Sequence, residues 1–559
     1  MTTTPVPPRP HSARHAMTSI PPLALMALAL LQQQAAALVP QQTRTNADPS
    51  SASEQLQRDL DAAVAAGRSS FAITPGVYRP SRDLLVNTAR DLSISPGRGG
   101  SVTLIFTCNW GLVLRSCVNV SVANVTIDYD SPCYSQGVVT GSEPGSFTYT
   151  LDEGFPAPVG ESAVSDARFA QAPIVAGIRF DPRTHIELGR VKLPYNYRNS
   201  SLWRRGIEHL GDHSYRLAIG FLHDNATIYK GEIVAVVPRA GHTVLLTNSS
   251  SCTIEGLTVH GSSDMALVEY GGGGAHAWRG NRVVRNATKR PMSMLASNAD
   301  VFQSSGCERG PLFESNEIGP AGDDCINIHN YFSVVLKRDA DNPRRVLLLD
   351  AVGAHDIVGD SHYAEAYEGW HQQLNTFSRV KLGDAVRVYD HMQLGQLRLA
   401  TTVVAKPEES TERADLALAN QTLAGLGLHV QLRDWAGTVR TYWVELQDEI
   451  PSAVLSRAFI NVDRLSSGGA VVRGNSFTGC NAIHFKSIGG TVEDNFMNNT
   501  LGIGILMWPG WLEGSIGLRD VLVARNSIIN SVRLANASHT VVVGKGTTNI
   551  TVIPGPVDV

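Results

Sequence analysis

Residues 298–329 read NADVFQSSGCERGPLFESNEIGPAGDDCINIH, two short strand-like runs separated by turns, with acidic residues ahead of each run. Asp300 and Asp323 are 23 residues apart. An interval of roughly 20 to 35 residues corresponds to one coil of a stacked β-solenoid. Strands of neighbouring coils lie about 4.8 Å apart. We therefore expect Asp300 to lie beside the Asp323–Asp324 pair.

The same pattern recurs on both sides of this stretch, from residue 71 to residue 131 and again after residue 456. An asparagine stands just before a strand-like step in five of these units, at Asn281, Asn316, Asn475, Asn495 and Asn526. Stacked asparagine side chains can hydrogen-bond to one another along the turn of a parallel β-helix. The alternative is that each asparagine forms a turn without such a ladder. Both alternatives predict one turn per coil.

Two segments, 132–246 and 331–455, have longer alternating strands that are typical of antiparallel β-modules. The predicted fold is all-β: a right-handed parallel β-helix with two inserted antiparallel β-barrel-like modules. An amphipathic helix over 54–67 should cover the first strand edges. The predicted solenoid segments are 54–131 with this helical cap, 247–330 with the acids, and 456–559.

The N-terminus resembles a secretory signal. Residues 21–31 form an eleven-residue apolar run followed by small residues, too short to span a bilayer comfortably. We expect a signal peptide over 1–38, a linker over 39–53 and a secreted protein, with a membrane anchor or an internal helix as the alternatives. Acceptor triplets for N-glycosylation agree with secretion; they begin at Asn119, Asn124, Asn199, Asn225, Asn248, Asn286, Asn420, Asn498, Asn536 and Asn549. Asn119 and Asn124 are expected to lie inside coils.

Composition excludes some partners. The 559 residues carry 47 basic and 51 acidic side chains and a net charge of −4, which does not favour nucleic acid or an anionic membrane surface. The seven cysteines form no metal-binding signature. A bridge between Cys108 and Cys117 is one option, and Cys325 is expected to be a small buried residue and not a nucleophile.

Three carboxylates so close together cannot all ionise cheaply, so at least one pKa should rise. A protonated acid beside an ionised one is the pairing that glycoside hydrolysis requires. The alternative is that these aspartates cap turns or bind a cation.

The run SMLASNADVFQSSGCERGPLFESNEIGPAGDDCINIHN, residues 293–330, resembles the core motif of glycoside hydrolase family 110, the α-1,3-galactosidases, which are parallel β-helix enzymes. By this resemblance, Asp323 would be the general acid, and Asp300 with Asp324 would hold and deprotonate the attacking water. The implied reaction is the exo-acting, inverting and metal-independent removal of terminal α-1,3-linked galactose from an oligosaccharide or glycoconjugate, without a cofactor.

The match has departures. This chain has Val301-Phe302-Gln303 where the family tends to have Gly then Phe-His, and Asn330 follows His329. Polygalacturonases are the nearest rival, since they also place an Asn-Thr-Asp step before an Asp-Asp pair on a β-helix. Their later Gly-His-Gly and Arg-Ile-Lys steps are missing here, with only residues 484–486 as a loose equivalent.

Polar and aromatic residues near the acids are candidate sugar contacts, although each is also compatible with a packing role. They are Asn298, Gln303, Asn327, His329, His484, Lys486, Trp508 and Trp511. Glu269 and His276 flank a glycine-rich run that we expect to be a loop near the cleft. Two other function classes remain: a non-catalytic glycan-binding β-helix, and a Ca²⁺-dependent polysaccharide lyase, which would need an oxygen-rich metal cage.

Overall fold

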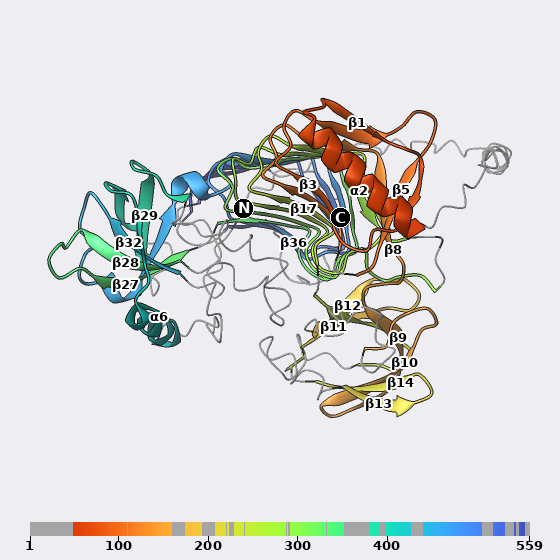
Figure 1. The fold of residues 1–559 in the computed structure, drawn as a ribbon. Coiled ribbons are helices and arrows are strands. Elements are labelled where there is room, and N and C mark those ends of the chain that lie inside the picture. The colour runs from red at the N-terminus through yellow and green to blue at the C-terminus, as the bar shows by residue number, and fades with distance from the viewer. Residues whose placement is uncertain are drawn as a thin grey trace, which may run out of the picture. The chain divides into compact units, whose positions relative to one another are not determined.

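Three parallel sheets run side by side along the body of the protein, and successive coils add one strand to each (Figure 1). We describe a computed structural model. It describes residues 49–108, 110–158, 174–192, 207–219, 221–222, 228–239, 241–286, 288, 291–330, 332–350, 379–390, 397–425, 440–505, 518–530, 541–543 and 547–553. The predicted signal peptide over 1–38 lies outside these residues.

The first two solenoid sheets contain ten and nine strands among the described residues. In spatial order the first is β1 (Ser70–Ile73), β4 (Ser93–Pro96), β7 (Ser121–Ala123), β18 (Thr253–Glu255), β21 (Ala277–Arg279), β24 (Leu312–Glu314), β34 (Ala470–Arg473), β37 (Gly490–Glu493), β40 (Arg519–Ala524) and β43 (Thr548–Ile553). The second is β2 (Gly76–Tyr78), β5 (Val102–Phe106), β8 (Val125–Tyr129), β19 (Thr258–Val259), β22 (Arg282–Val284), β25 (Glu317–Gly319), β35 (Ser476–Thr478), β38 (Phe496–Asn498) and β41 (Ser527–Ile529).

The third solenoid sheet carries the acids, and we call it the site sheet. Its order is β3 (Leu84–Asn87), β6 (Leu112–Arg115), β17 (Val244–Thr247), β20 (Leu267–Tyr270), β23 (Phe302–Ser305), β26 (Ile326–His329), β36 (Ala482–Phe485), β39 (Gly502–Ile505) and β42 (Val541–Val543). The sequence had placed β17 in the first inserted module. Its parallel pairing with β6 and β20 makes it a solenoid strand.

Rows of apolar side chains fill the solenoid. Leu267, Phe302, Ile326 and Ile483 are in register on four consecutive strands of the site sheet, and all are fully buried. Burying each such side chain stabilises the fold by about 1.5–3 kcal/mol. Because side chains alternate between the two faces of a strand, this inner row also fixes the outward row beside it.

The predicted asparagine ladder is confirmed. The Nδ2 and backbone N–H of Asn281 donate to Oδ1 of Asn316 at 3.1 and 2.8 Å. The same pair of hydrogen bonds joins Asn316 to Asn475, Asn475 to Asn495, and Asn495 to Asn526. Because each buried amide is satisfied by the next coil, the ladder holds the coils in register.

Helix α2 (Pro49–Ala65) covers the first coil, as predicted. It buries Leu56, Leu60 and Ala63, which lie on one face of a helix. The Gln57 amide donates to Leu85 O and accepts from Leu85 N–H, which satisfies the edge strand β3. The helix begins at Pro49, inside the segment expected to be a linker, since proline suits a first helical turn. No helix of the described residues is both long enough and apolar enough to span a membrane.

Both inserts are antiparallel sheets, which confirms the predicted fold class. Insert 1 (residues 135–238) consists of β9 (Ser135–Glu143), β10 (Ser146–Leu151), β11 (Ile174–Phe180), β12 (Glu187–Lys192), β13 (Ile207–Gly211), β14 (Ser214–Ala218), β15 (Phe221–Leu222) and β16 (Ile233–Pro238). Insert 2 (residues 333–462) consists of β27 (Ser333–Arg338), β28 (Arg345–Asp350), β29 (Ala385–Asp390), β30 (Leu397–Thr402), β31 (Glu408–Ser410), helix α6 (Arg413–Gly425), β32 (Arg440–Glu445) and β33 (Ala458–Val462).

Insert 2 is tied to the solenoid by arginines. The guanidinium group of Arg379 donates to Gly306 O at 2.7 Å and Gly272 O at 3.2 Å. Arg464, just after β33, binds both carboxylate oxygens of Asp384 at 2.8 Å. Helix α6 was not expected from the sequence, where the alternation of the flanking strands suggested hairpins throughout.

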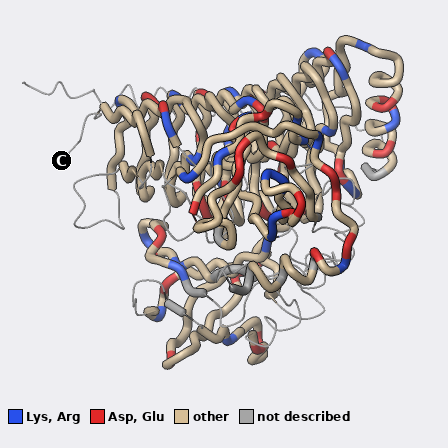
Figure 2. The backbone as a smooth tube through the Cα atoms, turned by 90° about the vertical axis from the view of Figure 1, so that its left-hand side faces the viewer, with Lys and Arg blue, Asp and Glu red and all other residues tan. Residues whose placement is uncertain are grey.

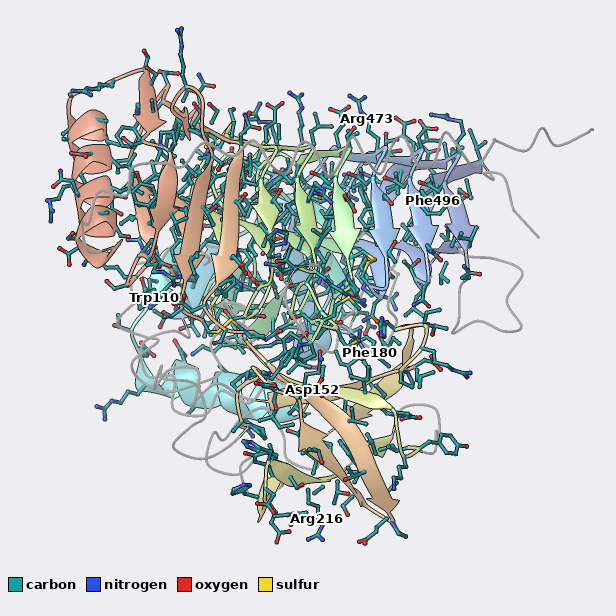
Figure 3. All side chains as sticks on the ribbon, turned by 90° about the vertical axis from the view of Figure 1, so that its right-hand side faces the viewer. Trp110, Asp152, Phe180, Arg216, Arg473 and Phe496 are labelled. Carbon is teal, nitrogen blue, oxygen red and sulfur yellow. A yellow bond between two sulfur atoms is a disulfide. The ribbon has the colours of Figure 1, made fainter. Side chains whose placement is uncertain are left out.

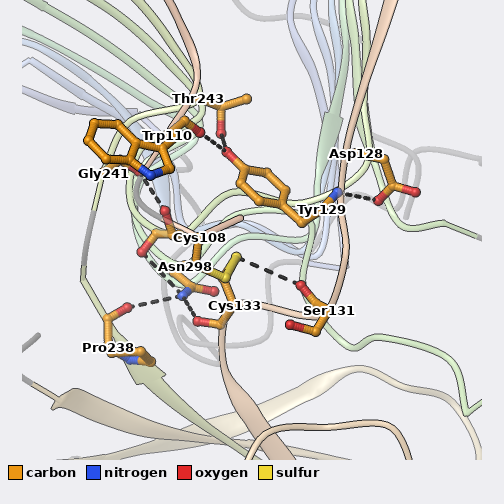
Figure 4. Close-up of a disulfide and its surroundings, with 11 residues drawn as sticks. Cys108, Trp110, Asp128, Tyr129, Ser131, Cys133, Pro238, Gly241, Thr243 and Asn298 are labelled. Atoms are coloured by element: carbon orange, nitrogen blue, oxygen red, sulfur yellow. Dashed lines mark hydrogen bonds between the residues drawn. A yellow bond between two sulfur atoms is a disulfide. The ribbon is translucent and has the colours of Figure 1, made fainter. Parts of the chain in front are cut away.

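Two disulfides link residues far apart in the sequence. Cys108 bonds Cys133 (Figure 4) and Cys325 bonds Cys480, so the suggested Cys108–Cys117 bridge is wrong. Cys325 is buried as expected, but it is bridged and not a free thiol. The remaining three cysteines, at 117, 252 and 307, are buried and free.

Basic and acidic residues are interspersed over the coils (Figure 2). Glu314, for example, lies between Arg279 at 3.3 Å and Arg473 at 2.6 Å on neighbouring strands of the first sheet. These pairs are largely exposed, so each contributes little to stability.

The glycosylation acceptors Asn119 and Asn124 lie within solenoid coils, as expected, and both are exposed. Both occupy corners of the solenoid with positive φ, at 54° and 58°, a conformation that asparagine tolerates. Acceptors at 199, 225 and 536 lie outside the described residues.

Candidate active site

Three carboxylates from two neighbouring coils meet at one edge of the site sheet. Asp300 precedes β23, and Asp323 with Asp324 precedes β26. One oxygen of each carboxylate lies within 4.8 Å of the others. The predicted convergence of Asp300 with the aspartate pair is therefore confirmed. Asp300 and Asp324 are buried, whereas the side chain of Asp323 is 30% exposed.

Close backbone packing brings the two coils together here. A Cβ at Gly322 would lie 2.1 Å from Asn298 O, so only glycine fits. The backbone N–H of Asp324 donates to Oδ1 of Asp300 at 3.3 Å, and Val301 N–H donates to Asp324 O at 2.9 Å. The Asn-Ala-Asp and Gly-Asp-Asp steps are therefore two halves of one local structure.

A row of polar side chains continues outward from the acids. Gln303, Asn327 and His484 are in register on β23, β26 and β36. The side-chain oxygens of Gln303 and Asn327 are buried and have no hydrogen-bond partner among the described residues. A buried acceptor without a donor is unfavourable by about 1–3 kcal/mol. These two oxygens are acceptors beside the acids that no donor among the described residues satisfies.

His329 and Lys486 lie one step further along the same strands, and both are buried. His329 Nε2 is 2.9 Å from Gln303 Nε2, and its Nδ1 is 3.0 Å from Asn330 O. This pattern fits a neutral imidazole that carries its proton on Nδ1 and accepts from Gln303. His329 therefore orients Gln303. The backbone N–H of Lys486 donates to Ile328 O at 2.8 Å.

The next coil supports the aspartate pair. His484 Nδ1 lies 2.8 Å from Oδ2 of Asp324, and Asn481 Nδ2 donates to Oδ1 of Asp323 at 2.8 Å. The Cys325–Cys480 disulfide joins the same two coils directly beside these contacts. The coil that carries the acids is therefore covalently fixed to the coil that carries their partners.

Asp323 is held by two arginines: Arg190 of insert 1, and Arg239, which directly follows insert 1. Arg239 makes an ion pair with Oδ2 of Asp323, and Arg190 Nη1 lies 3.5 Å from Oδ1. Burial raises the pKa of Asp323, but Arg239 and Arg190 outweigh burial, so that the pKa lies below its usual range. This direction is opposite to the one expected for a proton donor at Asp323.

Asn298 has a structural role that the sequence did not suggest. Its Nδ2 donates to Cys133 O at 2.7 Å, Pro238 O at 3.0 Å and Ser263 O at 3.3 Å (Figure 4). Cys133 and Pro238 are the residues where the chain leaves and rejoins the solenoid around insert 1. Asn298 therefore clamps both ends of insert 1 to the coil that carries Asp300, and its amide nitrogen is fully used.

The other expected contacts fall into two groups. Trp508 and Trp511 lie outside the described residues. Glu269 and His276, expected on a loop near the cleft, point into the solenoid and are buried. Glu269 accepts hydrogen bonds from Trp278 and Ser304. The glycines beside it form a corner of the coil and not a long loop.

Sequence reasoning missed three side chains of the site. Arg190, Arg239 and Asn481 contact Asp323 directly. None of the three belongs to the motif at residues 293–330, so the sequence carried no signal for them.

The acids could also reach one cation. Ca²⁺ takes six to eight oxygen ligands at about 2.3–2.6 Å, and three carboxylates within 4.8 Å supply part of such a shell. Arg239 and Arg190 already place positive charge against Asp323. The donor set therefore fits a cation poorly.

No protein-family model matches this sequence. No curated protein matches it either. Among solved structures, the chain is similar to the A-module of mannuronan C-5 epimerase AlgE4 from Azotobacter vinelandii, with 9% identity, a TM-score of 0.28, and coverage of 91% of this chain and 93% of that one. It is also similar to the Streptococcus pneumoniae surface protein and adhesin PfbA, with 8% identity, a TM-score of 0.28, and coverage of 90% and 93%. The receptor-binding domain of the siphovirus 9NA tailspike follows, with 10% identity, a TM-score of 0.14, and coverage of 90% and 76%. At these scores the likenesses carry no statement about activity.

Proposed function

We propose that this protein is a secreted, exo-acting glycoside hydrolase that removes terminal α-1,3-linked galactose from glycans with inversion. The single observation that carries the hydrolase proposal is the meeting of Asp300, Asp323 and Asp324 within 4.8 Å beside buried, unpartnered amide oxygens. The choice of galactose and of the α-1,3 linkage rests on the resemblance of residues 293–330 to glycoside hydrolase family 110.

The amide oxygens favour a ligand rich in hydroxyl groups. Gln303 and Asn327 each present a buried acceptor in one row next to the acids. A sugar hydroxyl donates one hydrogen bond and would satisfy such an acceptor. A site built to bind hydroxyls discriminates strongly against ligands that lack them, because its buried polar groups would stay unpaired.

The charges favour a neutral sugar over polygalacturonate. Arg190 and Arg239 are both engaged with Asp323, so that two guanidinium groups face three carboxylates. With one of the three carboxyls protonated, as the reaction requires, the two guanidinium charges and the two carboxylates cancel, so this group of residues offers no excess positive charge to hold an anionic sugar. A receptor for a carboxylate would need arginines that are not already paired with an acid.

The reaction needs two carboxyl groups, an ionised one that acts as the base and a protonated one that acts as the acid. A carboxylate takes a proton from water as the water oxygen bonds to the anomeric carbon. The glycosidic bond breaks, and its electron pair goes to the leaving oxygen, which takes the proton of the acid. Asp323 stays ionised, and its side chain is 30% exposed and so open to water, which suits the role of base. By elimination, the donor belongs to the Asp300–Asp324 pair, where His484 orients Asp324.

Inversion rests on the family resemblance and not on the measured spacing. Inverting sites separate their carboxyl groups by about 6.5–9.5 Å, against about 5–5.5 Å in retaining sites. The nearest oxygens of the three aspartates lie within 4.8 Å. A water held between Asp323 and the buried pair must therefore use the outer oxygens of these groups.

The test is an assay of purified protein against aryl α-galactosides, Galα1-3Gal oligosaccharides and polygalacturonate. We expect release of galactose from the α-1,3-linked substrates and none from polygalacturonate. Binding of these glycans without turnover would replace the hydrolase by a glycan-binding protein. Loss of activity with a chelator, restored by Ca²⁺, would point to the metal-dependent class.

A further inference from the structure

We infer that Arg239 and Arg190 are positioning residues that fix Asp323 as the base of the reaction, and that the insert 1 segment is therefore part of the catalytic machinery. This inference rests on the proposed hydrolase function. It assigns a task to a module that lies outside the motif at residues 293–330. It also reverses the role that the resemblance implies for Asp323.

The two arginines contact different oxygens of the Asp323 carboxylate. Arg239 pairs with Oδ2 of Asp323 and Arg190 with Oδ1. Asn481 donates to the same Oδ1 from the following coil. With both oxygens engaged by charged or amide donors, the carboxylate is confined in position as well as in charge.

Arg239 lies at the root of insert 1, the point where the chain rejoins the solenoid. It follows Pro238 directly, and the Pro238 carbonyl is held by Asn298 Nδ2. The same amide holds Cys133 O at the other end of the insert (Figure 4). The Gln136 side chain adds a hydrogen bond to Met292 O at 3.1 Å. The position of Arg239 is therefore set by the coil that carries Asp300.

Arg190 reaches the acids from β12, inside the sheet of insert 1. Its Nε lies 3.1 Å from Glu187 Oε1, which orients the guanidinium group. The side chain is 13% exposed, and its Nη2 is buried with no hydrogen-bond partner among the described residues.

Several charged or titratable groups surround Asp323 and bear on its protonation. They are Arg239 and Arg190 from insert 1 and its root, Glu187 behind Arg190, Asp300 and Asp324 from the solenoid, and His484 from β36. The cations favour the ionised form of Asp323, while the acids oppose it. The guanidinium groups lie closest to its oxygens and prevail. Asp323 consequently stays ionised to a lower pH than an ordinary aspartate and remains available to deprotonate water.

The experiment compares the pH dependence of kcat/KM for the wild-type protein and for Arg239→Gln, Arg239→Lys and Arg190→Gln on an aryl α-galactoside. We expect Arg239→Gln to lose activity at least tenfold. The acidic limb of its kcat/KM profile should move upward by about one pH unit, because a cation within about 4–6 Å lowers the pKa of a carboxylic acid by that order. Arg239→Lys keeps the charge and should keep the limb near its wild-type position.

Arg216→Gln is the matched control. Arg216 pairs with Glu208 at 2.6 Å on β13 and β14, at the far end of insert 1 from the solenoid (Figure 3). This variant should match the wild-type profile. An acidic limb that stays in place in Arg239→Gln would overturn the inference. A shift of the basic limb alone would instead make Asp323 the proton donor and would also overturn it.

A second measurement separates this inference from the proposed function. In protein labelled with ¹³C at aspartate carboxyls, the resonance absent from Asp323→Asn identifies Asp323. Its titration midpoint should rise in Arg239→Gln, whether or not the protein turns over a substrate. A raised midpoint in a protein inactive on every galactoside would refute the proposed α-galactosidase activity and keep the charge-setting contact. Turnover with an unchanged midpoint would refute the inference alone.

Discussion

The buried carboxyl of Glu269 makes the stability of this protein depend on pH. Glu269 lies on β20 and points into the solenoid, where it is fully buried. Trp278 Nε1 donates to its Oε2 at 2.9 Å and Ser304 Oγ donates to its Oε1 at 2.6 Å. Burial raises the pKa of Glu269 to about 7, although the hydrogen bonds from Ser304 and Trp278 counteract part of this rise.

The magnitude follows from the difference between the folded and unfolded states. The pKa of Glu269 rises from an ordinary value of 4.5 to about 7 in the fold. Between these values the folded state binds more protons than the unfolded chain, so the free energy of unfolding falls as pH rises. At 1.36 kcal/mol per unit, the loss amounts to about 3 kcal/mol and is complete above pH 7.

The perturbation is Glu269→Gln, which keeps the shape of the side chain and removes its titration. The amide presents a donor where Glu269 had an acceptor, which costs about 1–3 kcal/mol at every pH. The informative quantity is therefore the pH dependence of the variant's free energy of unfolding and not its value at any one pH. Urea unfolding at pH 4.5, 6 and 8 should show a smaller fall in the free energy of unfolding than in the wild-type protein, by about 3 kcal/mol over this range.

Glu255→Gln is the control, because Glu255 lies on β18 of the first solenoid sheet and its side chain is exposed. It should leave the pH dependence as in the wild-type protein. Parallel stability curves for Glu269→Gln and the wild-type protein would refute the reasoning, since they would mean that the buried carboxyl does not change its protonation between pH 4.5 and 8.

Three further predictions concern the coils and the acids. Asn475→Ala should lower the free energy of unfolding by about 2–4 kcal/mol in urea unfolding, because the buried N–H of Asn316 and the buried carbonyl of Phe313 lose their hydrogen-bond partners. An unchanged urea midpoint would contradict a stabilising role of the asparagine ladder. Replacing Cys325 and Cys480 by serine should destabilise the fold by about 2–4 kcal/mol and lower kcat more than it changes KM; wild-type kcat would show that the bridge does not hold the acids in place. Asp324→Asn should recover part of its rate on an aryl galactoside with a good leaving group, whereas the base variant Asp323→Asn should not; the reverse order, read from kcat on two leaving groups, would exchange the roles.

Local periodicity made much of the fold predictable. An asparagine and a set of short alternating strands recur from coil to coil, and the 23-residue interval between Asp300 and Asp323 is about the length of one coil. Residues that recur at that interval stack in space, because every coil adds one strand to each sheet. The ladder at Asn281, Asn316 and Asn475 and the acid cluster were therefore visible in the sequence.

Contacts that cross an insert have no such signal. Cys325 is 155 residues from Cys480, because insert 2 lies between them. The separation depends on the length of the insert and not on the coil, so no spacing rule relates these residues. Glu269 was misplaced for another reason. The glycine-rich run beside it looked like a loop, although the residue lies on a strand and points inward.

The most direct test of the proposed chemistry is the product formed first from an α-linked galactoside, followed by NMR during the first minutes of reaction. We predict that β-galactose appears first from Galα1-3Gal and from an aryl α-galactoside, and that Asp323→Asn releases neither anomer at a comparable rate. Appearance of the α-anomer first, a glycosyl group trapped on Asp300, Asp323 or Asp324, or full activity in Asp323→Asn would contradict the account.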